Sequence, residues 1–240
     1  MIWNITSSTA RSDPPLVLAG APVRIIRPVQ ARRMRLAFDA ARREVRLTVP
    51  PRASLKKAIV WARGHEDWVR GQMASAPDQV ALIPGAIFLL EGRDVQIHWS
   101  ASAPRAPDLR GDALHVGGPA EGVEARVLRW LKARALRQLT QDTMMLAERE
   151  GLRVAKIGIG DPRGRWGSCT AQGVIRYSWR LILAPPDVRL STVAHELAHI
   201  DHMDHSPAFH ARHRAILGRD PRPARAWLKA HGARLQAIGR

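Results

Sequence analysis

Two histidines and a glutamate near the carboxyl end give this sequence its clearest chemical signal. They form the pattern His-Glu-x-x-His at His195, Glu196 and His199. On an α-helix, residues four apart share one face, so the two imidazoles can converge on one metal ion with the glutamate beside them. The pattern indicates the active-site helix of a zinc hydrolase.

Glu196 is the predicted catalytic residue of that site. A bound zinc ion lowers the pKa of a coordinated water towards neutrality, and a carboxylate beside it can accept the proton and pass it to the leaving group. Glu196 is spaced too closely to His195 to be a third ligand. We therefore predict that it acts as general base and then as general acid.

A third metal ligand has to come from elsewhere in the chain. No glutamate follows Glu196, which excludes a glutamate from a later helix. His202 shares the helical face of the motif, but three ligands along two turns of one straight helix span roughly 10 Å and cannot all reach one ion. We expect His202 at the rim of the pocket. The remaining candidates are Asp201, Asp204, His205, His210, His213 and Asp220.

His205 is the best placed of these candidates. Ser206 and Pro207 are typical of the N-cap and first position of a new helix, so His205 falls at the bend where the chain turns back. The predicted zinc ligands are therefore His195, His199 and His205.

The same histidines could instead be ordinary packed residues, because matches to a five-residue motif arise by chance. The surrounding sequence favours the metal site. Two prolines and an aspartate at 185–187 are a helix start signal. Apolar residues at helical spacing then form an inward stripe beside the histidines: Leu190, Val193, Ala194 and Leu197.

A second informative segment, residues 165–169, reads Arg-Trp-Gly-Ser-Cys. Glycine permits close backbone approach, and a serine hydroxyl with neighbouring N–H groups can bind a substrate or an oxyanion. Trp166, Gly167 and Ser168 are therefore predicted to bind substrate. Cys169 as a nucleophile paired with a histidine is a rival mechanism, and Cys169 is also an alternative zinc ligand. The histidine motif explains more residues with fewer assumptions.

Length and composition limit the class of protein. With 240 residues and 45% hydrophobic content, the chain can form one large domain or two small ones. No apolar run approaches the roughly 18 residues that span a bilayer, and the start lacks a basic segment leading into an apolar one. The single cysteine excludes an internal disulfide framework. We expect a cytoplasmic protein with no membrane partner.

The net charge of +17 would attract phosphate backbones and acidic surfaces alike. Most of the cations are arginine and alanine is also frequent, a bias that genome composition alone can produce. No base-reading motif is visible in the sequence. Nucleic acid is therefore a possible partner beside the expected polypeptide substrate.

The predicted fold class is α+β, with a β-rich half followed by a zincin-like helical half. Residues 1–20 are interpreted as a leader, 21–118 as the β-rich subdomain and 119–240 as the metallopeptidase subdomain. The segment 160–173 is expected to be a loop. The elements expected from hydrophobic periodicity are hairpins at 34–49 and 87–99, strands at 113–116, 154–159 and 174–183, and helices at 54–73, 120–150, 207–217 and 221–235.

Taken together, the motifs resemble those of the YgjP-like metallopeptidases, which are related to the SprT-like zinc proteases. The resemblance extends over roughly 22–235 and rests on an ordered set of motifs rather than on the metal motif alone. That set is Arg165-Trp-Gly-Ser-Cys169, Ser178-Trp-Arg-Leu181, His195-Glu-Leu-Ala-His199 and Asp204-His-Ser-Pro-Ala-Phe209.

The resemblance implies a minimal zincin-type peptidase in which the three predicted histidines hold zinc and Glu196 is catalytic. The family commonly has Asn before the third histidine and Trp after the phenylalanine, where this chain has Asp204 and His210. Asp204 could still orient His205 or cap the next helix. We therefore expect zinc-dependent hydrolysis of peptide bonds. The alternatives are a hydrolase of small-molecule amides, and a non-enzymatic binder of nucleic acid or protein with a structural zinc site.

Overall fold

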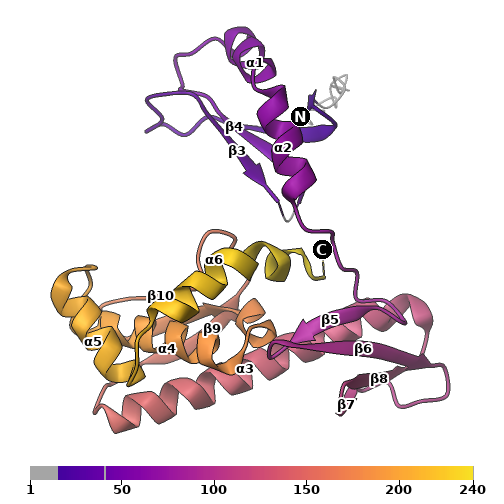
Figure 1. The fold of residues 1–240 in the computed structure, drawn as a ribbon, viewed down its shortest axis with the longest axis vertical. Coiled ribbons are helices and arrows are strands. Elements are labelled where there is room, and N and C mark those ends of the chain that lie inside the picture. The colour runs from indigo at the N-terminus through magenta and orange to yellow at the C-terminus, as the bar shows by residue number, and fades with distance from the viewer. Residues whose placement is uncertain (1–15, 41, 240) are drawn as a thin grey trace, which may run out of the picture. The chain divides into compact units, whose positions relative to one another are not determined.

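The computed structural model describes residues 16–40 and 42–239 of the chain. The fold divides into two compact units, with the division between Pro77 and Asp78. Each unit contains helices and a mixed sheet, which confirms the α+β class (Figure 1). The boundary expected at 118/119 lies inside the second unit, because the helix that follows it packs against the strands that precede it.

The sheet of the first unit has the strand order β1-β2-β4-β3. The expected hairpin is present, with β3 (Arg35–Asp39) antiparallel to β4 (Glu44–Thr48). β2 (Ala21–Ile26), which we did not predict, lies parallel to β4, and β1 (Val17–Leu18) pairs with β2. Of the expected leader, residues 1–15 lie outside the described residues, whereas β1 falls within the predicted range and is a strand.

The single helix predicted over residues 54–73 is wrong. α1 (Leu55–Arg63) begins after Ser54, whose hydroxyl accepts a hydrogen bond from the N–H of Lys57. The helix ends at Gly64, and α2 (Glu66–Ser75) begins two residues later. Glycine inside a helix costs about 1 kcal/mol relative to alanine, so the break falls where continuation is least favoured.

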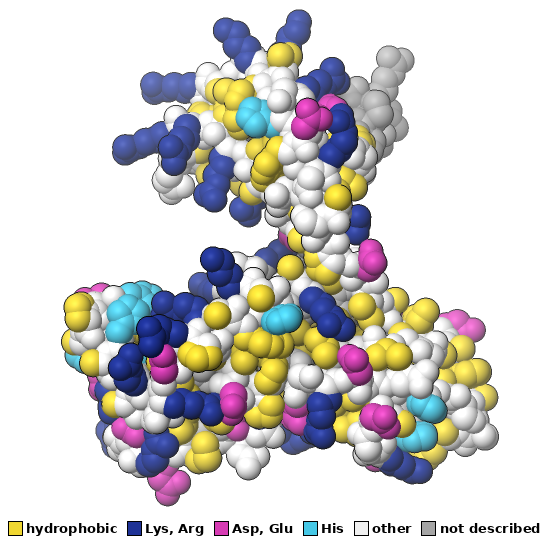
Figure 2. Space-filling view, viewed as in Figure 1, with side chains coloured by type: hydrophobic (Ala, Val, Ile, Leu, Met, Phe, Trp, Pro, Cys, Tyr) yellow, Lys and Arg dark blue, Asp and Glu magenta, His cyan; other side chains and the backbone are white. Residues whose placement is uncertain are grey.

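Lysine and arginine side chains project from much of the first unit (Figure 2). Arg24 of β2 and Arg46 of β4 are direct neighbours across the sheet, and both are exposed. Arg33 and Arg35 at the start of the hairpin are exposed as well. The arginine face of the hairpin is therefore open to solvent.

The second unit begins with a sheet of strand order β5-β6-β8-β7. β5 (Ile87–Leu90) and β6 (Arg93–Ser100) form the predicted second hairpin, and the two residues between them have φ angles of 52° and 79°. Left-handed residues at both positions are typical of the two-residue turn that matches strand twist. β8 (Ala113–Gly117) lies parallel to β6, and β7 (Asp108–Arg110), which we did not predict, runs antiparallel to β8.

One long helix, α3 (Val123–Arg149), joins the two parts of this unit. A short 3-10 turn at Ala120–Gly122 precedes it. In the core, α3 packs against both the β8 sheet and α4 (Pro186–Asp201), and a buried ion pair of 2.7 Å joins its Asp142 to Arg189 of α4. Its buried apolar face consists of Val123, Val127, Leu131, Ala135, Leu139, Leu146 and Ala147.

The second sheet of this unit has the order β10-β11-β9. β9 (Lys156–Gly160) and β11 (Val174–Ser178) are parallel, and β10 (Gly167–Cys169) is an antiparallel edge strand. The segment expected to be a loop therefore contains a strand. Its three residues are too few for a period-two pattern to be read from the sequence.

The strand predicted over residues 174–183 is only half correct. It ends at Ser178, whose hydroxyl accepts a hydrogen bond from the N–H of Arg180 and caps a 3-10 turn over Trp179–Leu183. All five turn residues are buried, so their apolar run reflects burial in the core rather than a strand.

Three helices complete the unit and lie together with β9 and β10 (Figure 1). They are α4 (Pro186–Asp201), α5 (Pro207–Leu217) and α6 (Arg222–Ala237). Gly218, with φ of +73°, ends α5 in the left-handed conformation that glycine adopts most readily. None of the helices in the described residues is long and apolar enough to cross a lipid bilayer.

Candidate active site

α4 carries the His-Glu-x-x-His pattern and is buried over most of its length. Pro186 lies in its first turn, where the missing N–H costs no helical hydrogen bond. Val193 and Leu197 anchor the helix in the core. His195 and His199 then lie on the same face, with ring centroids 5.0 Å apart.

His205 lies in the turn between α4 and α5. Ser206 is the N-cap of α5, and its hydroxyl accepts a hydrogen bond from the N–H of Phe209. The turn brings Nε2 of His205 to 3.3 Å from Nε2 of His195. The sequence signal for a helix start at Ser206 and Pro207 thus marks the bend that brings the third histidine to the other two.

The three imidazoles fit one metal ion. Their ligand nitrogens all lie within 4.8 Å of one another. A tetrahedral ion with metal–nitrogen bonds of about 2.0–2.1 Å holds two nitrogens about 3.3–3.4 Å apart. The Nε2–Nε2 distance of 3.3 Å between His195 and His205 matches this separation. Three imidazoles are a donor set that suits zinc and other divalent transition metals.

A hydrogen bond fixes the orientation of the His199 ring. Its Nδ1 lies 3.0 Å from the backbone carbonyl oxygen of His202, to which it donates. Nε2 is thereby left with its lone pair, as a metal ligand requires. His202 was expected at the pocket rim, and the contact it makes here is through its backbone rather than its ring.

The other acidic and histidine candidates lie outside this cluster. Asp201 forms a 2.7 Å ion pair with Arg212, and Asp220 bonds Arg222. Asp204 accepts a hydrogen bond from the N–H of Ser206, the N-cap residue of α5, and so stabilises the turn that precedes this helix.

His213, also considered as a ligand, is buried beside the cluster. Its Nε2 lies 3.0 Å from the carbonyl oxygen of Ser191, and its ring packs against His195 with centroids 5.2 Å apart. His210 is exposed, and its ring centroid lies 6.4 Å from that of His205. Neither residue joins the three clustered imidazoles.

The ring of Phe209 packs against all three clustered histidines. Its fully buried ring lies 4.9, 4.5 and 4.7 Å from the rings of His195, His199 and His205. The sequence indicates that Phe209 faces inward in α5, but helical spacing alone cannot show that it contacts all three rings, because two of them belong to another helix.

Burial keeps the motif histidines neutral. Desolvation, reinforced by the charges of neighbouring histidines and Arg225, lowers the pKa of His195 to about 3. Desolvation also lowers the pKa of His199, although its bond to the carbonyl of His202 acts in the opposite direction. The neutral imidazole is the form that binds a metal.

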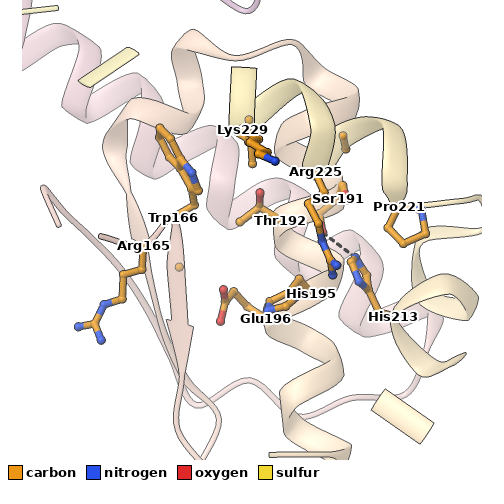
Figure 3. Close-up of a pocket in the computed structure, with 13 residues that line it drawn as sticks. Arg165, Trp166, Ser191, Thr192, His195, Glu196, His213, Pro221, Arg225 and Lys229 are labelled. Carbon is orange, nitrogen blue, oxygen red and sulfur yellow. Dashed lines mark hydrogen bonds between the residues drawn. The ribbon is translucent and has the colours of Figure 1, made fainter. Parts of the chain in front are cut away.

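Glu196 is 4% exposed and lies beside β10 (Figure 3). Burial raises the pKa of its carboxyl to about 7, and the charge of Arg165 opposes this shift. Gly167 gives the carboxyl its space, since a Cβ at that position would lie 2.3 Å from Oε1 of Glu196. A carboxyl with a pKa near neutrality can both accept and release a proton.

The predicted substrate-binding segment divides between two hollows. Trp166 and Gly167 line the same pocket as Glu196 and His195, whereas Ser168 lines a separate hollow. Within β10, Gly167 and Ser168 point to opposite faces, because successive residues of a strand alternate, and Trp166 precedes the strand. Trp166 packs on α6, where a Cβ at Gly232 would lie 2.9 Å from its ring.

Cys169 lies near Glu196 but is not activated. Burial and the negative charge of Glu196 raise the pKa of its thiol to about 11. Its Sγ donates to the carbonyl oxygen of Thr170 at 3.3 Å, and the three-histidine cluster does not include it. The thiolate needed for nucleophilic attack is therefore disfavoured at neutral pH.

The chain matches a known protein family over most of its length. The family model described as "YgjP-like, metallopeptidase domain" matches residues 32–231. The chain belongs to the YgjP-like family. This YgjP-like match begins in the first unit and includes all three clustered histidines, Glu196 and the segment around β10. The resemblance drawn from the sequence is confirmed. A search of curated proteins and a search of solved structures each found no match.

Proposed function

We propose that the protein is a zinc-dependent peptidase whose ligands are His195, His199 and His205. The single observation that carries the proposal is the convergence of three imidazole nitrogens within 4.8 Å beside a buried glutamate. The metallopeptidase domain to which the chain belongs supports the same activity. A polypeptide is accordingly the proposed substrate.

Zinc, when bound, supplies a Lewis acid that lowers the pKa of water and polarises the scissile carbonyl. Glu196 accepts the proton of the attacking water at its carboxylate and then donates it to the leaving amine. Its burial beside Gly167 holds the carboxylate in place and raises its pKa towards that of an effective proton shuttle.

The edge strand β10 is proposed to bind the substrate backbone. It is the outer strand of its sheet, and α4 packs beside it. An extended peptide can add to such an edge through backbone hydrogen bonds. Trp166 and Gly167 would then contact side chains or backbone next to the scissile bond, in keeping with their place in the pocket of Glu196.

Hydrolysis of a small-molecule amide uses the same chemistry and is the nearest alternative. An open sheet edge favours a peptide, because a small molecule has no backbone to pair with it.

Binding of nucleic acid by the basic first unit is a separate candidate activity, which the exposed arginines of β2 and β4 favour. It would coexist with hydrolysis rather than replace it.

The proposal is tested with Glu196→Gln. Glutamine keeps the size of the side chain and cannot accept the proton, so we expect one zinc per chain to remain and turnover on a denatured protein substrate to fall by roughly 10²–10⁴-fold. Metal content is measured by elemental analysis and cleavage by mass spectrometry. A Gln variant that cleaves as fast as wild type would overturn the proposed mechanism.

A further inference from the structure

A pocket of about 490 Å³ adjoins the proposed catalytic residues. Ser191, Thr192, His195 and Glu196 from α4 line one side of it. α6 lines the opposite side with Arg225, Leu228 and Lys229, and Trp166 closes one end (Figure 3). This volume lies within the range of pockets that bind small ligands, and it is ample for one substrate side chain. Because it shares His195 and Glu196 with the proposed site, its occupant would lie next to the scissile bond.

The charges around this pocket are unbalanced. Three cationic side chains line it, Arg165, Arg225 and Lys229, and Glu196 is the only acidic residue among the lining residues. In Figure 3, Arg165 extends away from the other lining residues, whereas Arg225 and Lys229 project from α6 over the pocket. The two α6 cations are four residues apart, so they share one face of the helix.

Neither Arg225 nor Lys229 forms an ion pair within the part of the chain that the structure describes. Elsewhere on this unit, arginines near the site have carboxylate partners: Arg212 bonds Asp201 and Glu150, and Arg222 bonds Asp220. Exposed cations are common on a surface, but two on one helix face above an apolar pocket next to a proposed catalytic centre are placed to meet a ligand.

His213 does not compete with these cations for an anion. Its Nε2 is committed to the carbonyl oxygen of Ser191, and its buried Nδ1 has no hydrogen-bond partner in the described chain. With the ring neutral and Nε2–H donating, Nδ1 is an acceptor. An acceptor cannot bind a carboxylate, so recognition of negative charge falls to the α6 pair.

We propose that Arg225 and Lys229 select substrates that carry a carboxylate on a residue flanking the scissile bond. The carboxylate would come from an Asp or Glu side chain, or from the carboxyl terminus of the substrate. The apolar walls formed by Trp166, Ala224 and Leu228 would pack against the methylene groups that carry it. This inference rests on the proposed peptidase function and adds a substrate preference to it.

The test uses short peptide hydroxamates, which bind the metal of a zinc-loaded protein without being cleaved. One series places glutamate or glutamine before the metal-binding group, and a second places either residue after it. A third pair ends in a free carboxylate or an amide. Binding to full-length, zinc-loaded protein is measured by calorimetry. We expect one carboxylate compound to bind about tenfold more tightly than its amide partner. A gain in a Glu series identifies a side chain, and a gain in the third pair identifies a carboxyl terminus.

Charge reversal then assigns the preference to the two cations. The double variant Arg225→Glu with Lys229→Glu should lose the tenfold gain while still binding the uncharged compounds. Arg234→Glu reverses one charge on α6 outside the pocket lining and should bind like wild type.

The outcomes separate this inference from the proposed function. Equal binding of carboxylate and amide compounds in every series, or a preference that survives the double reversal, overturns the carboxylate pocket and leaves the metal site standing. Failure of every hydroxamate to bind the zinc-loaded protein overturns the metal site and the pocket together.

Discussion

Gly167 of β10 leaves the space that the carboxylate of Glu196 occupies. A Cβ at position 167 would lie 2.3 Å from Oε1 and 2.6 Å from Cδ of Glu196. Contacts this short do not occur between packed atoms, so a side chain and the carboxylate cannot both remain where they are. The edge strand and the proposed general base therefore fit together only because residue 167 is glycine.

Gly167→Ala is accordingly expected to impair catalysis more than folding. Displacement of the Glu196 carboxylate by about 1 Å should reduce kcat/KM by roughly 10²-fold. Zinc content should be unchanged, because the three atoms nearest to the new methyl group all belong to Glu196 and not to a proposed ligand. Steady-state kinetics and elemental analysis of the same preparation measure both effects.

Gly158→Ala is the matched control for that substitution. Gly158 lies in β9 of the same sheet, and a Cβ there would meet no heavy atom within 4 Å. It should keep the kcat/KM of wild type. Full activity of the Gly167 variant would show that Glu196 is not held at its working position by β10.

The ligand set predicts which substitutions remove the metal. His205→Ala should lose most of the bound zinc, since two imidazoles four apart on a helix form an incomplete site. His202→Ala should retain it. The contact of His202 with the site is its backbone carbonyl, which accepts from Nδ1 of His199 and is unaffected by the change of side chain.

Elemental analysis of protein purified without added zinc compares these variants. Asp204→Ala is a second control, because Asp204 bonds the N–H of Ser206 and not a histidine. Retention of zinc in His205→Ala, with loss in His202→Ala or Asp204→Ala, would contradict the ligand assignment.

Local signals explain why so much of the site region could be predicted from the sequence. The spacing of His195 and His199, the helix start at Ser206 and the glycine at 218 each act over a few residues. The structure brings the three histidines together where these signals place them. The two hairpins and α5 follow local patterns in the same way.

What the sequence did not reveal depends on contacts between distant segments. β2 pairs with β4, and the short β10 is a strand only because β11 lies beside it. The boundary between the units follows from the core that α3 shares with β8 and α4. Nothing in the sequence indicates that Arg225 and Lys229 line the same pocket as Glu196, because they approach it only when α6 packs beside α4 in the folded protein.

Cys169→Ser distinguishes the proposed mechanism from a thiol mechanism. Burial and the charge of Glu196 raise the pKa of the thiol to about 11, which disfavours the thiolate at neutral pH. We expect the kcat of the serine variant to stay within about twofold of wild type, since no step of the proposed mechanism uses the sulfur. A loss of several hundredfold with zinc content intact would instead favour the cysteine.

Phe209 is predicted to tune the metal site through packing. Its ring contacts all three proposed ligand rings, so it restricts their rotation and holds the nitrogens together. Phe209→Leu keeps an apolar side chain in the core and should lower the free energy of unfolding by about 1–2 kcal/mol. Loss of the flat ring beneath the imidazoles should weaken zinc affinity by roughly tenfold, the scale seen when groups that orient ligands are removed.

Phe88→Leu separates this effect from general destabilisation. Phe88 of β5 is 2% exposed in the same core, and among the described residues its ring contacts no histidine ring. Its substitution should cost a similar free energy of unfolding and leave zinc affinity unchanged. Competition with a chelator at 25 °C measures the affinity, and chemical denaturation of the metal-free proteins measures the stability. Equal zinc affinities in the two variants would show that Phe209 contributes to the core alone.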